Sequence, residues 1–345
     1  MAGHFLFLFL SLLFGGCRTS AQPEPNLQKF GFESDHMGTL FTITLYATNS
    51  AVARTAAEAA FRRVAALDEI MSDYRADSEL NLLCEKSVGQ PVPISTELFD
   101  VFMKTQRISE MSDGAFDVTI GPFVRLWRFS RKRKTLPTAA EIQSARAAFG
   151  WRNLRLDGER RTATLLVPNM RLDLGGIAKG YAADEALRVL RTHGIPRAMA
   201  AASGDFAVGD SPPDRPGWKI GITAIDERNN QASRMVTLHN CGISTSGDTE
   251  QAIEIEGRRY SHIVDAATGL GLTNRIQVSV IAPDATTSDG LATALCVMGV
   301  ERGLALMNKT PKTAALIFTR TGETNRSFVA GQDRESVQAL EAHQN

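Results

Sequence analysis

The chain has few cysteines and no excess of charge of either sign. Beyond the N-terminal region only Cys84, Cys241 and Cys296 remain, and they are widely spaced. An odd number of scattered cysteines indicates neither a disulfide framework nor a cysteine-rich metal site. The 38 basic and 38 acidic residues give a formal net charge of zero. The composition therefore does not indicate a nucleic-acid partner, and we expect none.

Long apolar runs are also scarce, and the run at the N-terminus is too short to cross a membrane. Phe5–Phe14 is apolar and is followed by two glycines and Cys17. This pattern is typical of a secretory leader with a lipoprotein-type cleavage site, in which Cys17 becomes the lipidated first residue. An uncleaved hydrophobic anchor, or a plain signal peptide cut nearby, is the alternative. We expect residues 1–17 to be a leader and residues 18–29 a tether, with the protein exported and lipid-anchored to a membrane, facing the periplasm or the cell exterior.

The remaining composition is that of a soluble globular protein. Of the 345 residues, 43% are apolar and 22% are charged, which is ordinary for such a protein. This length allows one large domain or two modest ones. We expect one domain over residues 30–330 and a C-terminal tail over residues 331–345.

Periodicity predicts both strands and helices. Strands are expected at Leu40–Tyr46, Leu154–Leu156, Thr162–Val167, Met170–Leu174, Ala198–Ala202, Trp218–Ile222, Met235–Leu238, Gln277–Ile281 and Ala314–Phe318. Helices are expected at Ala51–Met71, Ser95–Ser112, Thr138–Phe149, Ile177–Leu190 and Thr287–Met298. The fold class is α+β, with a mixed, largely antiparallel sheet and flanking helices.

The most informative stretch is Arg171–Asp184, whose sequence is RLDLGGIAKGYAAD. Two glycines between a predicted strand and a predicted helix allow the backbone to approach an anion, usually a phosphate. Lys179 in the first helical turn could meet phosphate oxygens, and Asp173 could accept a hydrogen bond from a ligand. The alternative is an ordinary strand-to-helix turn.

Three other segments have both a functional and a structural interpretation. Tyr74 follows a helix end and could be a platform for a flat ring, or simply a partly buried surface tyrosine. Asp117 lies in a turn-rich segment and could bind a ligand, although capping a turn is its default role. Arg125–Lys134 contains six basic residues in ten. Such a run is usually a solvated loop, and the alternative is attraction of an anionic ligand or lipid surface.

Hard oxygen donors occur near the C-terminal helix. Asp289 and Thr293 are four residues apart and therefore project from one helix face. With a glycine carbonyl from the Gly175–Gly176 turn they would suit Mg²⁺, which prefers few protein ligands plus phosphate and water oxygens. The alternative is a carboxylate that stabilises the helix dipole and a threonine in the core. His262 and Asp265 flank a strand end before a turn. His262 beside Asp265 suits a base or a phosphate contact, although a lone histidine is usually structural.

Several segments, in this order, resemble the FAD:protein FMN transferase family, also known as the ApbE family. The matching segments are Met37–Thr39, Met71–Leu83, Asp113–Trp127, Asp173–Asp184, Ser244–Asp248, Tyr260–Gly269 and Ser288–Gly299. The resemblance implies a Mg²⁺-dependent enzyme that takes FAD as substrate. Such an enzyme attaches FMN through a phosphoester bond to a Thr or Ser of a target protein, typically a subunit of an exported redox complex, and releases AMP.

The resemblance also implies roles for individual residues. FAD contacts are expected at Met37, Tyr74, Ala115, Phe116, Asp117, Asp173, Lys179 and Val264. The Mg²⁺ site is expected at Gly176, Asp289 and Thr293, and catalysis at His262 or Asp265, which the sequence does not separate. Two alternatives stay open: an FAD pyrophosphatase that gives AMP and FMN, and a non-catalytic FAD-binding lipoprotein.

This chain departs from the usual family pattern at three places. Ala266 and Ala267 stand where a proline and a polar or basic residue are common, and Ala201–Asp205 replaces an Asn-containing pattern. Gly290 stands beside Asp289 where alanine is commoner. None of these changes removes an expected ligand.

Overall fold

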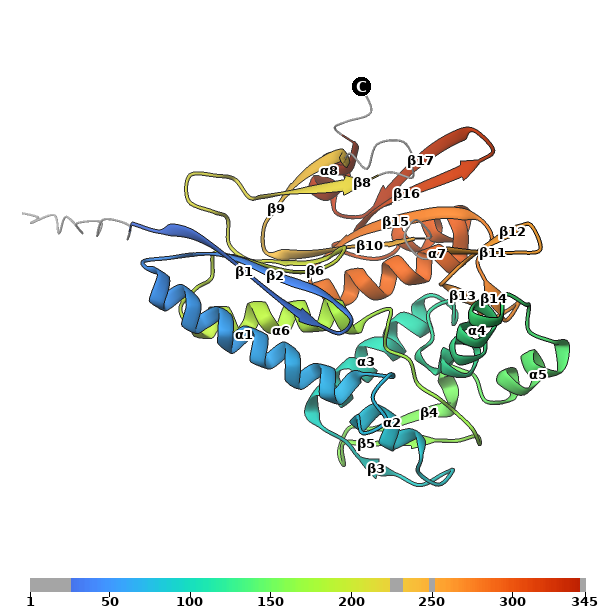
Figure 1. The fold of residues 1–345 in the computed structure, drawn as a ribbon. Coiled ribbons are helices and arrows are strands. Elements are labelled where there is room, and N and C mark those ends of the chain that lie inside the picture. The colour runs from blue at the N-terminus through green and yellow to red at the C-terminus, as the bar shows by residue number, and fades with distance from the viewer. Residues whose placement is uncertain (1–25, 224–231, 248–251, 342–345) are drawn as a thin grey trace, which may run out of the picture.

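A long antiparallel sheet organises the structure, a computed structural model that describes residues 26–223, 232–247 and 252–341 (Figure 1). The sheet has eight strands in the order β1-β2-β6-β7-β10-β15-β16-β17, and each neighbouring pair among these described strands is antiparallel. The predicted α+β class with a largely antiparallel sheet is therefore confirmed, and no parallel pairing occurs among the strands described. The predicted leader, residues 1–17 with Cys17, lies outside the described residues.

The strands of this sheet are short to medium in length. They are β1 (Gln28–His36), β2 (Thr39–Ala47), β6 (Ala198–Ala202), β7 (Asp205–Val208), β10 (Cys241–Gly247), β15 (Arg275–Ala282), β16 (Ala314–Thr321) and β17 (Thr324–Gly331). β1 begins at Gln28, within the segment expected to be a tether. Alternate residues of a strand face opposite sides, so Val278 and Val280 of β15 enter one core while Ile281 enters another.

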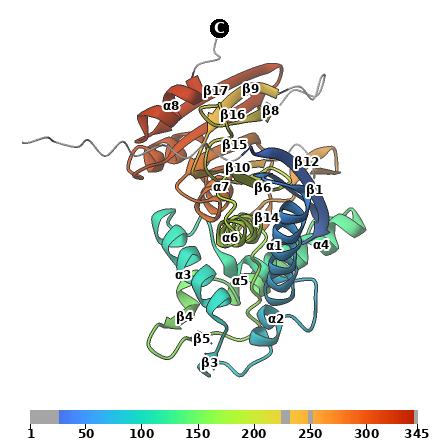
Figure 2. The same cartoon turned by 90° about the vertical axis from the view of Figure 1, so that its left-hand side faces the viewer.

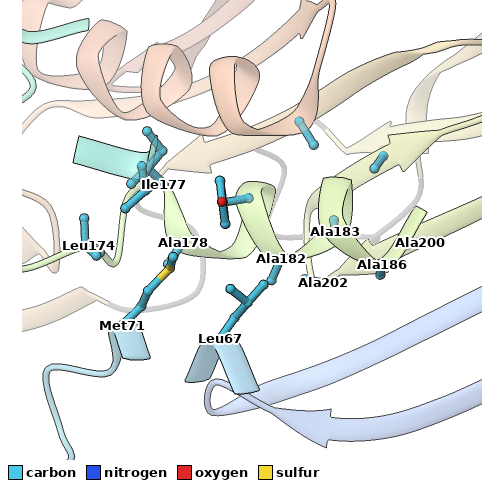
Figure 3. Close-up of a cluster of buried hydrophobic side chains, with 14 of the residues drawn as sticks. Leu67, Met71, Leu174, Ile177, Ala178, Ala182, Ala183, Ala186, Ala200 and Ala202 are labelled. Atoms are coloured by element: carbon cyan, nitrogen blue, oxygen red, sulfur yellow. The ribbon is translucent and has the colours of Figure 1, made fainter. Parts of the chain in front are cut away.

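Three helices cover the lower face of the sheet in Figures 1 and 2: α1 (Ser50–Met71), α6 (Ala178–Thr192) and α7 (Ala285–Met307). The inward face of α1 is rich in alanine, and α6 contributes Ala182, Ala183 and Ala186 to the same core. Figure 3 shows these small side chains of α6 between Leu67 of α1 and the alanines of β6. Small residues let the helices and the sheet approach closely, so backbone segments from distant parts of the chain come together around α6.

The opposite face of the sheet is covered by a hairpin and a short helix. The hairpin is β8 (Trp218–Thr223) with β9 (Ala232–Leu238), and the helix is α8 (Arg334–Glu341). Leu340 of α8 is fully buried in a core with Trp218 and Leu316. Residues 331–345, expected as a tail, thus include a helix that packs on the sheet.

A second region, made largely of residues 79–165, packs below the helices (Figure 2). Its elements are α2 (Glu79–Cys84), β3 (Val92–Pro93), α3 (Thr96–Met111), the 3-10 turn η1 (Val118–Ile120), α4 (Gly121–Arg133), α5 (Ala139–Ala147), η2 (Trp151–Asn153), β4 (Leu154–Asp157) and β5 (Thr162–Leu165). Two small hairpins lie nearby, β11 (Ala252–Ile255) with β12 (Arg258–Ser261) and β13 (Val264–Asp265) with β14 (Leu270–Gly271).

The predicted strand at Met170–Leu174 is wrong. Met170, Leu172 and Leu174 are buried, but the segment pairs with no described strand. The Asp173 N–H donates instead to the carbonyl of Val118 in η1 at 2.8 Å. The alternation of the sequence thus reflects one buried side of an extended segment and not a β ladder.

The predicted loop at Arg125–Lys134 is also wrong, because its residues up to Arg133 are helical in α4. Phe123, Trp127 and Ser130 are buried at helical spacing, which gives the helix a face to pack. The basic residues of its last turn lie at the negative end of the helix dipole, where positive charge stabilises the helix.

Among the described residues, α7 is the one helix that is long and apolar enough to cross a membrane, by length and composition alone. It packs here against β10, β15 and α6, and most of its first half is buried. It therefore serves as a core helix of this fold. Gly299 interrupts it with φ of 75°, so its first segment ends where the sequence predicted, at Met298.

The close approach of α6 and α7 depends on Gly180. A Cβ built there would collide with the Ala285 carbonyl and lie 2.8 Å from the Cβ of Asp289. We expect Gly180→Ala to destabilise the protein by about 1–3 kcal/mol, because overpacking outweighs the gain in helix propensity. Gly31→Ala is the matched control, since its Cβ would meet nothing within 4 Å. Urea unfolding would show the difference, and equal stability of the two variants would contradict this account of the packing.

Candidate active site

A single large cavity of about 1620 Å³ collects the residues singled out from the sequence. All of them line it: Met37, Tyr74, Ala115, Phe116, Asp117, Asp173, Gly176, Lys179, His262, Val264, Asp265, Asp289 and Thr293. The volume exceeds the roughly 300–1,000 Å³ of a typical small-molecule pocket. The cavity is therefore large enough for a ligand bigger than most small molecules.

The turn before α6 and the first turns of α7 meet at the base of this cavity. A Cβ at Gly176 would lie 3.0 Å from Thr293 Oγ1, so only glycine allows this approach without displacing the threonine. Thr293 Oγ1 also lies 3.2 Å from Ser246 Oγ of β10. The Gly180 N–H donates to Asp289 Oδ2 at 3.0 Å, which fixes that carboxylate against α6.

Two buried carboxylates share one ammonium group at this junction. Lys179 Nζ lies 2.7 Å from Asp205 Oδ2 and 3.9 Å from Asp289 Oδ2. Burial and the nearby Asp205 raise the pKa of Asp289 to about 7. Burial would lower the pKa of Lys179, but the two carboxylates raise it overall. Lys179, which was expected to meet phosphate, is thus paired with acidic groups. When both carboxylates are ionised, their negative charge exceeds the single positive charge of Lys179.

The donor set at this junction fits Mg²⁺. Asp289, Thr293 and the carbonyl of Gly176 offer only hard oxygen atoms, and the carboxylate charge exceeds what Lys179 supplies. The described residues contain no cluster of three or more His, Cys, Asp or Glu side chains that could hold a metal. A site with so few protein ligands leaves positions for water and phosphate oxygens, which is how Mg²⁺ is usually bound.

Asp205 was not identified from the sequence as a site residue. It begins β7, directly after the turn Ser203–Gly204, and its carboxylate is 3% exposed. The signal that was present is an Asp placed after an entirely apolar strand, Ala198–Ala202. Its partner Lys179 is distant in sequence, so the pairing required the fold.

On another wall, Tyr74 and Asp173 meet around Arg128 of α4. The Arg128 guanidinium carbon lies 4.2 Å from the centre of the Tyr74 ring. Its Nη1 is 2.6 Å from Asp73 Oδ2 and its Nη2 is 3.4 Å from Asp173 Oδ2. Burial, and then the Asp73 charge, raise the pKa of Asp173 to about 6, although the Gly175 N–H and Arg128 act to lower it.

Asp117 lines the cavity but caps a turn, its default role in the sequence. Its Oδ1 accepts from the N–H and hydroxyl of Thr119, each at 2.7 Å, and its Oδ2 accepts from the Trp151 N–H at 2.7 Å. Burial nevertheless raises the pKa of Asp117 to about 6, against the lowering effect of these hydrogen bonds. Asp117 therefore holds the Ala115–Phe116 wall of the cavity in shape.

His262 and Asp265 lie on the same rim in different circumstances. Asp265 Oδ1 accepts from the Ala267 N–H at 2.8 Å and so closes the turn that follows β13. His262 is an exposed residue on the cavity.

Met37, at the turn between β1 and β2, has φ of 50°, and its N–H donates to Asp68 Oδ2 at 3.4 Å.

The departure at Gly290 has a packing explanation. A Cβ at this position would lie 2.5 Å from Cδ1 of Ile108 in α3. Ile108 therefore occupies the space that an alanine methyl would need.

The fold and the site together define a class of protein. An eight-stranded antiparallel sheet, a glycine-rich turn packed against a core helix and a large cavity at that junction define an α+β protein with a site for a large ligand. The family model described as the ApbE family matches residues 37–318. The chain therefore belongs to the ApbE family, as the sequence motifs predicted.

Curated relatives and solved structures cover most of the chain. It is 33% identical over 301 residues to an FAD:protein FMN transferase of Vibrio cholerae, covering 86% of this chain and 87% of that protein. It is 27% identical over 332 residues to an FAD:protein FMN transferase of Escherichia coli, covering 94% of each. The flavin transferase ApbE structure from Vibrio cholerae matches with a TM-score of 0.80 at 29% identity, covering 92% of this chain and 99% of that chain. The apo flavinyl transferase ApbE of Pseudomonas stutzeri matches with a TM-score of 0.79 at 28% identity, covering 92% and 97%.

We predict that Asp289→Asn stabilises the metal-free protein at neutral pH. Because the folded-state pKa of Asp289 is about 7 and its ordinary value is 3.8, the folded state binds a proton more tightly than the unfolded state. Ionised Asp289 therefore lowers the free energy of unfolding progressively from about pH 4 to pH 7. The Asp289→Asn variant carries no such charge, so its free energy of unfolding should exceed that of the wild type by an amount that grows over this pH range. The difference should reach roughly 1–3 kcal/mol and then level off.

Urea unfolding in the presence of a chelator, from pH 5 to pH 8, measures this difference. Thr293→Val is the control, because it changes the same site without removing a charge and should keep the pH dependence of the wild type. An Asp289→Asn variant that is less stable at pH 8, or whose difference does not change with pH, would contradict the assignment of excess buried charge.

Proposed function

We propose that the protein transfers the FMN half of FAD to a Thr or Ser hydroxyl of a target protein and releases AMP. Membership in the ApbE family and similarity to FAD:protein FMN transferases support flavin transfer. The observation that carries the proposal is the α6–α7 junction. There Asp289 and Thr293 offer hard oxygen donors beside the Gly176 turn, and all three residues line the large cavity.

These three groups would hold Mg²⁺. When bound, the ion would neutralise the pyrophosphate of FAD and stabilise charge on the leaving phosphate of AMP. The protein's own contribution is to fix the carboxylate through the Gly180 N–H and to keep Lys179 between Asp205 and Asp289. A second reactant needs room beside FAD, and the cavity of about 1620 Å³ provides it.

The transfer step needs a base for the acceptor hydroxyl. The hydroxyl oxygen forms a bond to the FMN-side phosphorus, the bond from that phosphorus to the bridging oxygen breaks, and AMP leaves with that oxygen. We assign the hydroxyl proton to His262, because it is exposed on the cavity and a histidine suits proton transfer near neutral pH. Asp265 is assigned to the turn, because its Oδ1 already accepts from the Ala267 N–H.

We also propose where the enzyme acts. The apolar run Phe5–Phe14 and the following Cys17 favour export and lipid anchoring. An exported enzyme would meet acceptor subunits of exported redox complexes. We expect Cys17→Ser to abolish lipid attachment and to leave the apolar leader uncut, as measured by mass spectrometry of the N-terminal peptide.

The proposed reaction is tested with protein lacking residues 1–17, FAD, Mg²⁺ and a candidate acceptor domain. Chromatography follows AMP and FMN, and mass spectrometry follows the acceptor. We expect AMP together with an acceptor heavier by one FMN unit on a Thr or Ser, complete loss of both with a chelator, and recovery when Mg²⁺ is restored. AMP with free FMN and an unmodified acceptor would favour the pyrophosphatase, and FAD that is bound but never cleaved would favour a binding protein.

The roles of His262 and Asp265 are separated by two variants. We expect His262→Ala to lower the rate of transfer about 100-fold, because a positioned base typically contributes 10²–10⁴. FAD affinity should be unchanged. Asp265→Asn keeps a side-chain acceptor for the Ala267 N–H and should retain most activity. The reverse result, in which Asp265→Asn is the inactive variant, would transfer the role of base to Asp265.

A further inference from the structure

The basic run of the sequence divides into two faces once it forms α4. Arg125, Lys132 and Arg133 are exposed, whereas Arg128 and Arg131 line the cavity. Arg128 is the basic residue whose contacts reach the groups expected to bind FAD. Its side chain is 34% exposed, and it contacts Asp73, Asp173 and the Tyr74 ring together.

The loop that carries Tyr74 is held at its backbone by Asn81, whereas Tyr74 itself is largely exposed. Asn81 Nδ2 donates to the carbonyls of Asp73 and Arg75 at 3.1 and 2.8 Å, which fixes the main chain on both sides of Tyr74. The Tyr74 side chain is 79% exposed. A tyrosine so exposed loses entropy when it is held in one rotamer, so a platform needs a second contact to keep it in place.

Arg128 supplies that contact through its shape. A planar guanidinium can stack on an aromatic ring with one face while its N–H groups bind carboxylates in its own plane. Here the two terminal nitrogens reach Asp73 at 2.6 Å and Asp173 at 3.4 Å while the central carbon lies over the ring at 4.2 Å. The guanidinium thus ties the Tyr74 ring to the wall of the cavity.

We propose that Arg128 is a positioning residue for FAD that acts through Tyr74. It holds the ring of Tyr74 as a rigid platform on which a flat ring of FAD stacks by the opposite face. It also orients the Asp173 carboxylate toward the cavity. The inference rests on the proposed function, because it requires FAD as the ligand.

The test measures FAD affinity directly, by quenching of flavin fluorescence in the presence of a chelator, so that no turnover occurs. We expect Arg128→Ala and Tyr74→Ala each to weaken binding about tenfold, within the range of a stacked Arg–aromatic contact. The double variant should be no more than about twofold weaker than either, because both changes remove the same platform. Arg128→Lys keeps the charge without the planar stack and should fall between the wild type and Arg128→Ala.

Arg125→Ala is the matched control, because it removes the same charge from the exposed face of α4 and should leave FAD affinity unchanged. In the transfer reaction, Arg128→Ala should raise KM for FAD while kcat at saturating FAD stays near that of the wild type. A purely structural defect would instead lower kcat or the melting temperature, and it would do so in both Arg128→Ala and Arg128→Lys.

Three results would overturn the proposal in distinguishable ways. Additive losses in the double variant would mean that Arg128 contacts the ligand directly and not through Tyr74. Unchanged affinity in Arg128→Ala, with a wild type that binds FAD, would remove the positioning role and leave the proposed function intact. A wild type that does not bind FAD would overturn both.

Discussion

The structure depends on one close contact, between the start of α6 and the start of α7. Gly176 and Gly180 have no side chain, so the backbone of α6 can lie against Thr293 and Asp289. The Gly180 N–H then binds the Asp289 carboxylate at 3.0 Å. The alanine-rich faces of α1, α6 and β6 serve the same end, since they allow the layers around α6 to pack closely (Figure 3). A larger residue at Gly176 would push the turn away from Thr293, and one at Gly180 would push α6 away from Asp289.

That contact has an electrostatic consequence. Asp205 and Asp289 are both buried and share the single ammonium of Lys179, so the site carries more negative charge than it neutralises. A buried excess of carboxylate charge costs stability, and the raised pKa of Asp289 reflects this cost. A hard divalent cation bound here, as proposed above, would neutralise this excess. Elsewhere on the cavity wall, Arg128 likewise brings two carboxylates, Asp73 and Asp173, to one cation, and it also lies over the Tyr74 ring.

Much of the fold and most of the site were predictable, because their signals are local. The spacing of Asp289 and Thr293 reflects a helix, the pair of glycines before Lys179 reflects a tight approach, and all the residues chosen from such motifs line the cavity. The errors arose where a local pattern had two physical causes. Alternation at Met170–Leu174 came from one-sided burial without a strand partner, and the charge of Arg125–Lys134 masked the buried stripe of Phe123 and Trp127 that makes α4 a helix.

The sequence by itself determined the α+β class, the family and the identity of the chemical groups at the site, because residue types and short spacings specify these. Only the tertiary structure decided which groups act on one another. Lys179 pairs with Asp205 instead of standing free for phosphate, Asp117 is engaged by Thr119 and Trp151, and Arg128 stacks on Tyr74. Each of these pairings depends on distances of a few ångströms between groups brought together by folding, and electrostatic and hydrogen-bond energies fall steeply over such distances.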